Sequence, residues 1–548
     1  MAVPIIPVLA LSAVMLGAVY KYIIHPLFFS PLRRIPAAHL SVPFSPLWIL
    51  WIRQQGRQNR TILAAHERLG PVVRLGPREV SVNCVRGGLS TVYTGGMEKG
   101  EWYSNLFYNY GLPNMFSTNA SKPHSTRKRM ISNTYSKSNI NSSAVLTAQT
   151  SIILYERFLP QLFKTFSAQL TETASVLNIY ALISAVTMDI VTGYIFGLSA
   201  SSNLTSNTAS CSHFLDLYNG RRSYNFWPQE LPGVTRWARK LGIRLVPEFV
   251  DAANDEIEAW ALSMCDKAAI ALEQSSEEKK AGENPISLAD TPVVYGQLAS
   301  ALVKESQKEV QKDLNGDPNH PDVAGECQKS LRLTISSELL DHLAAGFDTS
   351  GITLTYLVHE LSQRRELQSA LRAELLTLSP PLLPSSAPVI PDAKALDVLP
   401  LLHAILWETL RLHPAIPGPQ PRVTPAGGCS LGPDPGFWVP GAVRVSASAG
   451  CLHANESVFK KAGSWKPERW LEVDGESRKE MDRWFWAFGS GGRMCVGSNL
   501  AIYQMKYIVA AIYSNFATSI VDDSGIEQED AYTAPPKSDK LMIQLERV

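Results

Sequence analysis

Apolar residues recur at helical spacing over most of the chain, and this pattern predicts a mainly α-helical fold. The clearest run lies between positions 331 and 362, where an apolar residue returns every four positions: Leu331, Ile335, Leu339, Leu343 and Phe347. This spacing predicts one long helix from Leu331 to Ser362. Weaker periodic runs predict helices within 152–196, at 401–413 and at 501–516, and the polar stretches 275–284 and 311–325 are predicted to be linkers.

Short runs bounded by glycine and proline predict a small β region beside the helices. Residues 71–82 read as two strands around a Gly-Pro turn, and 423–445 read as further short strands. Residues 531–548 are predicted to form a terminal hairpin. The fold class is therefore mainly α with a small β region.

The N-terminal stretch Val3–Tyr20 carries no charge and is long enough to cross a membrane. Its eighteen residues would form a helix of roughly 27 Å, close to the hydrocarbon core of a bilayer at about 30 Å. Lys21, Arg33 and Arg34 follow the span, and the positive-inside rule places them in the cytosol. A cleaved signal peptide is the alternative, but the first residues lack the positive charge that such peptides carry.

Composition excludes several classes of protein. The net charge of +1 gives no reason to expect a nucleic-acid partner. Hydrophobic residues make up 45% of the chain, which is enough for a large core. The seven cysteines contain no C-x-x-C pair, so they are expected to be reduced thiols on the cytosolic side of a membrane.

The stretch Phe488–Gly497 places Cys495 in a glycine-rich loop directly before a helix-like run. A helix N-terminus offers partial positive charge and free N–H groups, which favour a thiolate. A thiolate is a strong axial ligand for heme iron. A small buried hydrophobe and an anion-binding turn are the alternatives for such a segment. The whole pattern, F-x-x-G-x-R-x-C-x-G, resembles the heme-binding loop of the cytochrome P-450 superfamily, the heme-thiolate monooxygenases.

The predicted helix 331–362 contains a second motif, Ala345-Gly-Phe-Asp-Thr349. A glycine inside a helix costs about 1 kcal/mol relative to alanine, so Gly346 needs a reason. Close helix packing is one reason, with Thr349 bonding back to a carbonyl. The segment also resembles the oxygen-activation motif of the same family. The resemblance implies that Gly346 leaves room for O₂, Thr349 donates a hydrogen bond and Asp348 delivers protons.

A third motif pairs Glu408 and Arg411, three residues apart on a predicted helix. Such pairs are usually exposed and contribute little to stability. The resemblance instead implies a buried pair, completed by Arg469 of Pro467-Glu-Arg-Trp470, that supports the loop of Cys495. This role is structural and not catalytic.

The resemblance also assigns contacts to heme b, with Cys495 as the axial ligand of the iron. It implies that Phe488 packs against the ring and that several basic residues reach the propionates: Arg493, His124, Lys128 and Arg422. His124 and Lys128 lie one helical turn apart and share a face. The family commonly has arginine where this chain has Lys128, and a solvated basic face is the alternative for this segment.

The resemblance covers nearly the whole chain after the N-terminal span. It implies a cytochrome P-450 fold in three parts: residues 1–25 as a transmembrane signal anchor, 26–40 as a basic, proline-bounded hinge, and 41–548 as a single heme-thiolate catalytic domain. The anchor would hold the protein in the endoplasmic reticulum membrane as a single-pass protein with the catalytic domain in the cytosol.

The activity implied is insertion of one oxygen atom from O₂ into a lipophilic small molecule. Electrons would come from an NADPH–cytochrome P-450 reductase, since no flavin-binding or Rossmann stretch is present in the sequence. The chain resembles filamentous-fungal members that serve secondary-metabolite biosynthesis. The alternatives are a heme-thiolate isomerase or dehydratase that needs no O₂, whose members often lack the acid–alcohol pair, and a non-enzymatic heme-binding protein.

Overall fold

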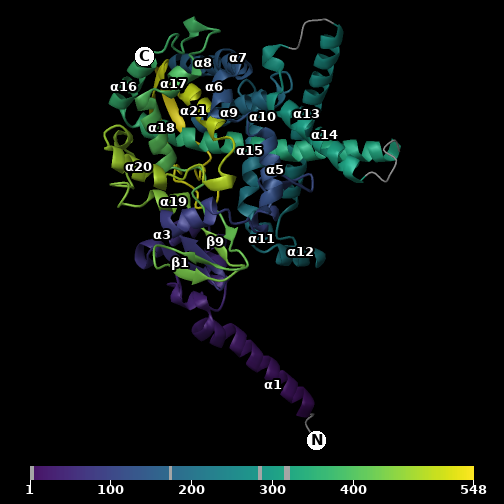
Figure 1. Ribbon diagram of the computed structural model, residues 1–548. Coiled ribbons are helices and arrows are strands. Elements are labelled where there is room, and N and C mark those ends of the chain that lie inside the picture. Colours follow the sequence, from purple (N-terminus) through teal and green to yellow (C-terminus); the bar gives the residue numbers. More distant parts are fainter. Residues whose placement is uncertain (1–4, 172–175, 282–286, 314–320) are drawn as a thin grey trace.

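The structure is a computed structural model that describes residues 5–171, 176–281, 287–313 and 321–548. Two helices, α9 (Ile179–Phe196) and α15 (Pro321–Ser362), form the centre of its helical part. α15 crosses the body of the molecule (Figure 1). A side chain Cβ added to Gly346 of α15 would lie 2.9 Å from Cγ2 of Val191 on α9. The mid-helix glycine therefore lets these two helices pack closely.

The other helices surround this pair, and α21 leads from the cysteine loop into the core. The principal ones before α15 are α5 (Ser121–Ile131), α6 (Lys137–Ser142), α7 (Ala144–Ile152), α8 (Leu159–Thr171), α10 (Thr208–Gly220), α11 (Phe226–Glu230), α12 (Pro232–Lys240), α13 (Glu248–Ala281) and α14 (Val293–Asp313). Those after it are α16 (Arg365–Leu375), α17 (Ala393–Asp397), α18 (Pro400–Leu412), α20 (Gly475–Trp484) and α21 (Ser498–Tyr513).

The β region is a four-stranded sheet at one end of the molecule, flanked by α2 (Leu47–Gln54), α3 (Gln58–Leu69) and α19 (Ala449–His453). Its order is β1 (Val72–Gly76), β2 (Glu79–Val82), β9 (Arg444–Ser446) and β6 (Arg422–Val423). β1 and β2 are antiparallel, with Val72 opposite Val82, and this confirms the two strands predicted within 71–82. A three-stranded sheet of β10 (Phe516–Asp522), β11 (Met542–Arg547) and β5 (Leu177–Asn178) lies apart from it.

Several predicted boundaries were wrong, because apolar periodicity reports only the buried part of a helix. α15 begins at Pro321, ten residues before Leu331, with proline in the first turn, where its missing N–H is tolerated. α13 extends to Ala281 and α14 to Asp313, into both predicted linkers; residues 282–286 and 314–320 lie outside the described residues. The terminal hairpin pairs β10 with β11, so its first strand starts at Phe516 and not near 531.

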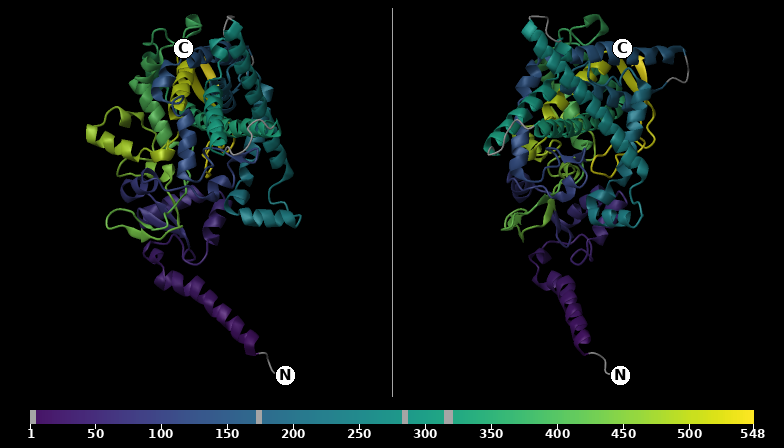
Figure 2. Two further views of the ribbon diagram at one scale, coloured as in Figure 1. Left: turned by 45° about the vertical axis from the view of Figure 1, so that its right-hand side comes forward. Right: turned by 90° about the vertical axis from the view of Figure 1, so that its right-hand side faces the viewer.

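The N-terminal helix α1 (Ile5–Val19) continues into a wider helical segment, Tyr20–Phe29, and projects away from the body (Figure 1). Two described helices are long and apolar enough to cross a membrane. Leu9–Phe29 has none of its surface buried, whereas Ile179–Phe196 is 94% buried and is the core helix α9. α11 and α12 lie at the same end of the molecule as α1 in all three views (Figures 1 and 2).

Candidate active site

The loop that carries Cys495 closes on itself and turns its sulfur toward backbone N–H groups. The Cys495 N–H donates to the Phe488 carbonyl at 3.0 Å, and α21 begins three residues later. Burial raises the pKa of Cys495, whereas hydrogen bonds from the backbone of Gly497 and Ser498 and the charge of Lys128 lower it. The side chain lies deep within the protein, yet part of its surface is free of contact with protein atoms. The sulfur therefore faces an interior space and can act as a ligand.

The segment Ala345–Thr349 of α15 is linked directly to the helix that follows the cysteine loop. Gln504 of α21 donates through Nε2 to the Gly346 carbonyl at 3.0 Å and to Ser350 Oγ at 2.7 Å. Ala345 is exposed, whereas its neighbours Ala344 and Gly346 are half-buried. Since the absent Cβ of Gly346 would point at α9, the structure explains this glycine by packing; room for O₂ beside it stays a prediction.

The two polar residues of this segment have different surroundings. Thr349 is half-buried, and its hydroxyl donates to the Ala345 carbonyl at 2.8 Å. Asp348 is buried, and the Tyr218 hydroxyl donates to its Oδ2 at 3.4 Å. Burial raises the pKa of Asp348 to about 6, and the positive charge of Arg222 moderates the shift. A carboxyl group with such a pKa can hold and release a proton near neutral pH.

Positive side chains converge from four separate segments on the same interior region. Arg493 donates to the carbonyls of Thr118 and Asn119, both at 2.6 Å, and Arg422 donates to the Tyr103 hydroxyl at 2.9 Å. Burial and the nearby charges of Arg493, Lys99, Lys128 and Arg422 lower the pKa of His124 to about 3. The group is enclosed, and its cations repel one another.

Lys99 belongs to this positive group, although sequence reasoning missed it. Its ammonium donates to the Phe116 carbonyl at 2.5 Å and lies over the Tyr103 and Phe116 rings. Burial, together with the charges of Arg422 and Arg493, holds its pKa well below the usual value. Lys99 lies outside any regular helix or strand, so no periodic pattern in the sequence indicates its burial. Its burial and its lowered pKa become evident only in the folded structure.

Lys128 is placed by the structure on the cysteine loop itself. Its ammonium donates to the carbonyls of Gly492 and Met494, both at 3.0 Å. A propionate contact for Lys128 stays a prediction, and the observed contacts tie this lysine to the loop of Cys495.

The enclosed surroundings of Cys495 fit a heme group. An uncovered sulfur that accepts backbone N–H bonds suits an iron ligand, and clustered buried cations need a compensating negative charge. Two propionates would supply that charge. Arg493, Arg422 and His124 would then be the side chains expected to hold them.

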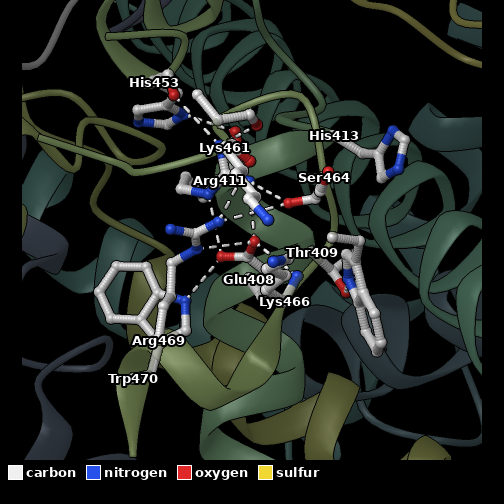
Figure 3. A network of polar contacts seen from close by, with 12 residues as sticks. Glu408, Thr409, Arg411, His413, His453, Lys461, Ser464, Lys466, Arg469 and Trp470 are labelled. Carbon is white, nitrogen blue, oxygen red and sulfur yellow. Dashed lines mark hydrogen bonds and ion pairs between the residues drawn. The ribbon is translucent and has the colours of Figure 1, made fainter. Parts of the chain in front are cut away.

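Glu408 is the centre of a buried polar network (Figure 3). Its fully buried carboxylate accepts bonds from Arg411 Nε at 2.9 Å and Nη2 at 2.7 Å, and from Arg469 Nε at 2.9 Å. The Lys466 N–H and Trp470 Nε1 donate to the same group at 2.8 and 2.9 Å.

Arg411 also donates to three backbone carbonyls: those of His453, Ala462 and Ser464. The network joins α18 to the segment that leads toward the cysteine loop.

A second buried network, centred on Glu230 of α11, was missed by sequence reasoning. Arg444 forms two bonds to its carboxylate, at 2.8 and 3.1 Å, and Arg53 and Trp102 each form one. Burial opposes ionisation, but the charges of Arg444 and Arg53 outweigh it and lower the pKa of Glu230 to about 2. The network ties α11 to the β region and to the aromatic loop around Trp102.

Taken together, this fold and site have the arrangement expected of a heme-thiolate enzyme, and comparisons with known proteins agree. The family model described as Cytochrome P450 matches residues 297–543. This chain belongs to the cytochrome P450 family. It is a monooxygenase, the class for which its relatives are named.

Three relatives, all from fungi, align with most of the chain. Cytochrome P450 monooxygenase avaI of Aspergillus versicolor is 29% identical, over 81% of this chain and 95% of its own length. Cytochrome P450 monooxygenase FGM1 of Gibberella zeae is 24% identical, over 99% and 96%. A pisatin demethylase of Fusarium vanettenii is 25% identical, over 94% and 90%.

Proposed function

We propose that this chain inserts one oxygen atom from O₂ into a lipophilic small molecule, by hydroxylation or epoxidation, with electrons from an NADPH–cytochrome P-450 reductase. The observation that carries the proposal is the uncovered Cys495 sulfur, which accepts backbone N–H bonds at the start of α21. The acid–alcohol pair of Asp348 and Thr349 supports oxygenation over isomerisation or dehydration. The fungal relatives, one of them named as a pisatin demethylase, support oxidation of a small molecule of secondary metabolism.

The residues divide the work between holding the cofactor and moving protons. When bound, heme supplies the chemistry that activates O₂. Cys495 would bind its iron, Phe488 would pack against the ring, and Arg493, Arg422, His124 and Lys128 would hold its propionates. Asp348, which accepts a hydrogen bond from Tyr218, would hold and release the proton, and the Thr349 hydroxyl would donate a hydrogen bond to O₂.

The spectrum of the reduced, CO-treated protein in membranes tests the cofactor assignment. We expect a strongly red-shifted Soret band, which is typical of a thiolate ligand. A band at the position of histidine-ligated heme would contradict the assignment. Consumption of NADPH and O₂ with added reductase then separates a monooxygenase from an isomerase, a dehydratase or a heme carrier.

Replacement of Thr349 by alanine is expected to leave heme binding intact and to divert reduced oxygen into hydrogen peroxide. Loss of a positioned hydrogen-bond donor should lower the product formed per NADPH by about tenfold or more. The measurement compares NADPH consumed, peroxide released and product formed. Thr353→Ala is the matched control, because Thr353 makes the same backbone bond one turn later, at 2.9 Å, but is buried. Equal coupling in the two variants would refute the role of Thr349.

The exposed apolar surface supports a membrane-bound protein, and we propose the endoplasmic reticulum as its membrane. Besides α1, large apolar side chains are exposed on α2 and around α12: Leu47, Trp51, Val234, Trp237 and Leu241. α11 contacts α2, and α11 and α12 lie at the end of the molecule from which α1 projects (Figure 2). This end can rest on the membrane while the rest of the catalytic domain, residues 41–548, faces the cytosol.

A cytosolic catalytic domain is expected to carry no N-linked glycan. The sequence has five N-x-S/T sites: Asn59, Asn119, Asn141, Asn203 and Asn455. Asn59 already donates to the Ala531 carbonyl at 2.8 Å. Treatment of the expressed protein with an endoglycosidase should leave its electrophoretic mobility unchanged. A shift, lost in a variant without these sites, would show that the domain faces the lumen.

A further inference from the structure

Asp341 lies on α15 one turn before Ala345. Its carboxyl group lies deep within the protein, but part of its surface is free of contact with protein atoms. The neighbouring Leu340 and His342 are buried, whereas Asp341 keeps part of its surface free. Burial raises the pKa of Asp341 to about 7, as expected for a carboxyl group far from bulk water. Residues four apart share one face of a helix, so Asp341 lies on the face that carries the uncovered Ala345.

Within the described residues, Asp341 has no hydrogen-bond or ion-pair partner for its carboxylate. The other acidic groups of this part of α15 are paired. Glu338 accepts the Met115 N–H at 2.9 Å and lies 3.3 Å from Arg127 Nη1, and Asp348 accepts a bond from Tyr218. Because Asp341 keeps part of its surface free, its carboxylate can bond a molecule that enters the interior space beside it.

Lys99, a positive group that acts on Asp341, is bonded elsewhere. It is close enough to lower the pKa of Asp341, but its ammonium is bonded to the Phe116 carbonyl and lies 3.8 Å from the centre of the Phe116 ring. His342 acts on Asp341 in the same direction and Glu338 in the opposite one. His342 is itself bonded to the Tyr135 hydroxyl at 3.0 Å. None of these side chains completes the hydrogen bonding of Asp341.

Aromatic rings border the region of Asp341. Asp341 contributes to the raised pKa of Tyr532, which burial dominates. The Tyr532 ring lies 5.2 Å from Trp102 and 5.9 Å from Phe107, and Phe107 lies 5.0 Å from Phe116. Asp341 and this aromatic cluster would together favour a cation, because both present negative potential.

We propose that Asp341 anchors the substrate through its positive charge, and that the natural substrate is a lipophilic molecule with a basic amine. The proposal rests on the proposed oxygenase function and adds a substrate class to it. The amine would lie against Asp341 while the apolar body of the molecule packs on the aromatic rings of Trp102, Phe107 and Tyr532. An ion pair of this kind fixes orientation, so Asp341 is a specificity-determining residue.

The test uses pairs of probes that differ only in charge. One member is a phenylalkyl-trimethylammonium ion, which cannot bind to iron through nitrogen, and the other is its uncharged tert-butyl isostere. Pairs with three alkyl lengths are measured by equilibrium dialysis against the full-length holoprotein in lipid nanodiscs. The variants are Asp341→Asn, which removes the charge at constant shape, and Asp341→Glu, which keeps it.

The wild-type protein is expected to bind at least one cation more tightly than its isostere. Asp341→Asn should weaken binding of that cation by roughly 30-fold, as for a truncated enclosed charge pair. Binding of the isostere should change less than about twofold, and Asp341→Glu should restore a preference for the cation. A wild-type protein that binds no cation, or an Asn variant that keeps the preference, would overturn the proposal. The CO spectrum of each sample shows separately whether the heme-thiolate assignment has failed.

Discussion

Cys495→Ala is expected to give a protein with no thiolate-ligated heme and no oxygenase activity. Cys495 is the one residue of its loop whose side chain is both deeply enclosed and chemically able to bind iron as an anion. Its sulfur accepts bonds from the backbone of Gly497 and Ser498, and alanine offers nothing in that position. The reduced, CO-treated variant should therefore lack the red-shifted Soret band completely.

The control for this prediction is Cys429→Ala. Cys429 lies on β7 (Cys429–Leu431) and is also a partly accessible thiol, but it is far from α21 in the sequence and is predicted to have no ligand role. Its variant should keep the normal band. Cys495→His adds a positive signal, because a band at the histidine-ligated position would show that residue 495 faces the iron. A normal thiolate band in Cys495→Ala would refute the ligand assignment.

Most of the features that the sequence predicted lie within one short segment; the exception is Arg469, which the family resemblance joined to Glu408 across 61 residues. The Cys495 loop, the Ala345–Thr349 segment and the Glu408–Arg411 pair each depend on residues a few positions apart. Their backbone context follows from local glycines and from helical spacing. The two strands within 71–82 were predicted for the same reason, since a Gly-Pro turn determines their pairing.

The features that sequence missed depend on contacts between distant segments. Glu230 becomes a buried ion-pair centre only because Arg53 and Arg444, 177 and 214 residues away, reach it. The reason for Gly346 lies on another helix, at Val191. Asp341 looks in the sequence like any polar residue of an amphipathic helix, and only its enclosed position without a partner makes it a candidate anchor.

The second large effect is expected for Glu408→Gln. Glutamine keeps the shape of the side chain but removes the negative charge, so Arg411 and Arg469 would remain buried beside each other without a counter-ion. Breaking a buried ion pair on one side costs about 3–5 kcal/mol in the free energy of unfolding. This change in the free energy of unfolding is measured by urea titration, with the loss of the thiolate CO band as the signal of unfolding.

The matched control is Glu476→Gln, because Glu476 and Lys479 form a pair with the same three-residue spacing on α20. Their side chains are 84% and 65% exposed, against 0% and 1% for Glu408 and Arg411. Solvent screens an exposed pair, so this variant should lose no more than about 1 kcal/mol. Equal losses in the two variants would mean that burial adds nothing to the Glu408 network. A large loss at Glu408 alone would show that the three-residue spacing, common on helix surfaces, becomes a structural determinant only where the fold excludes water.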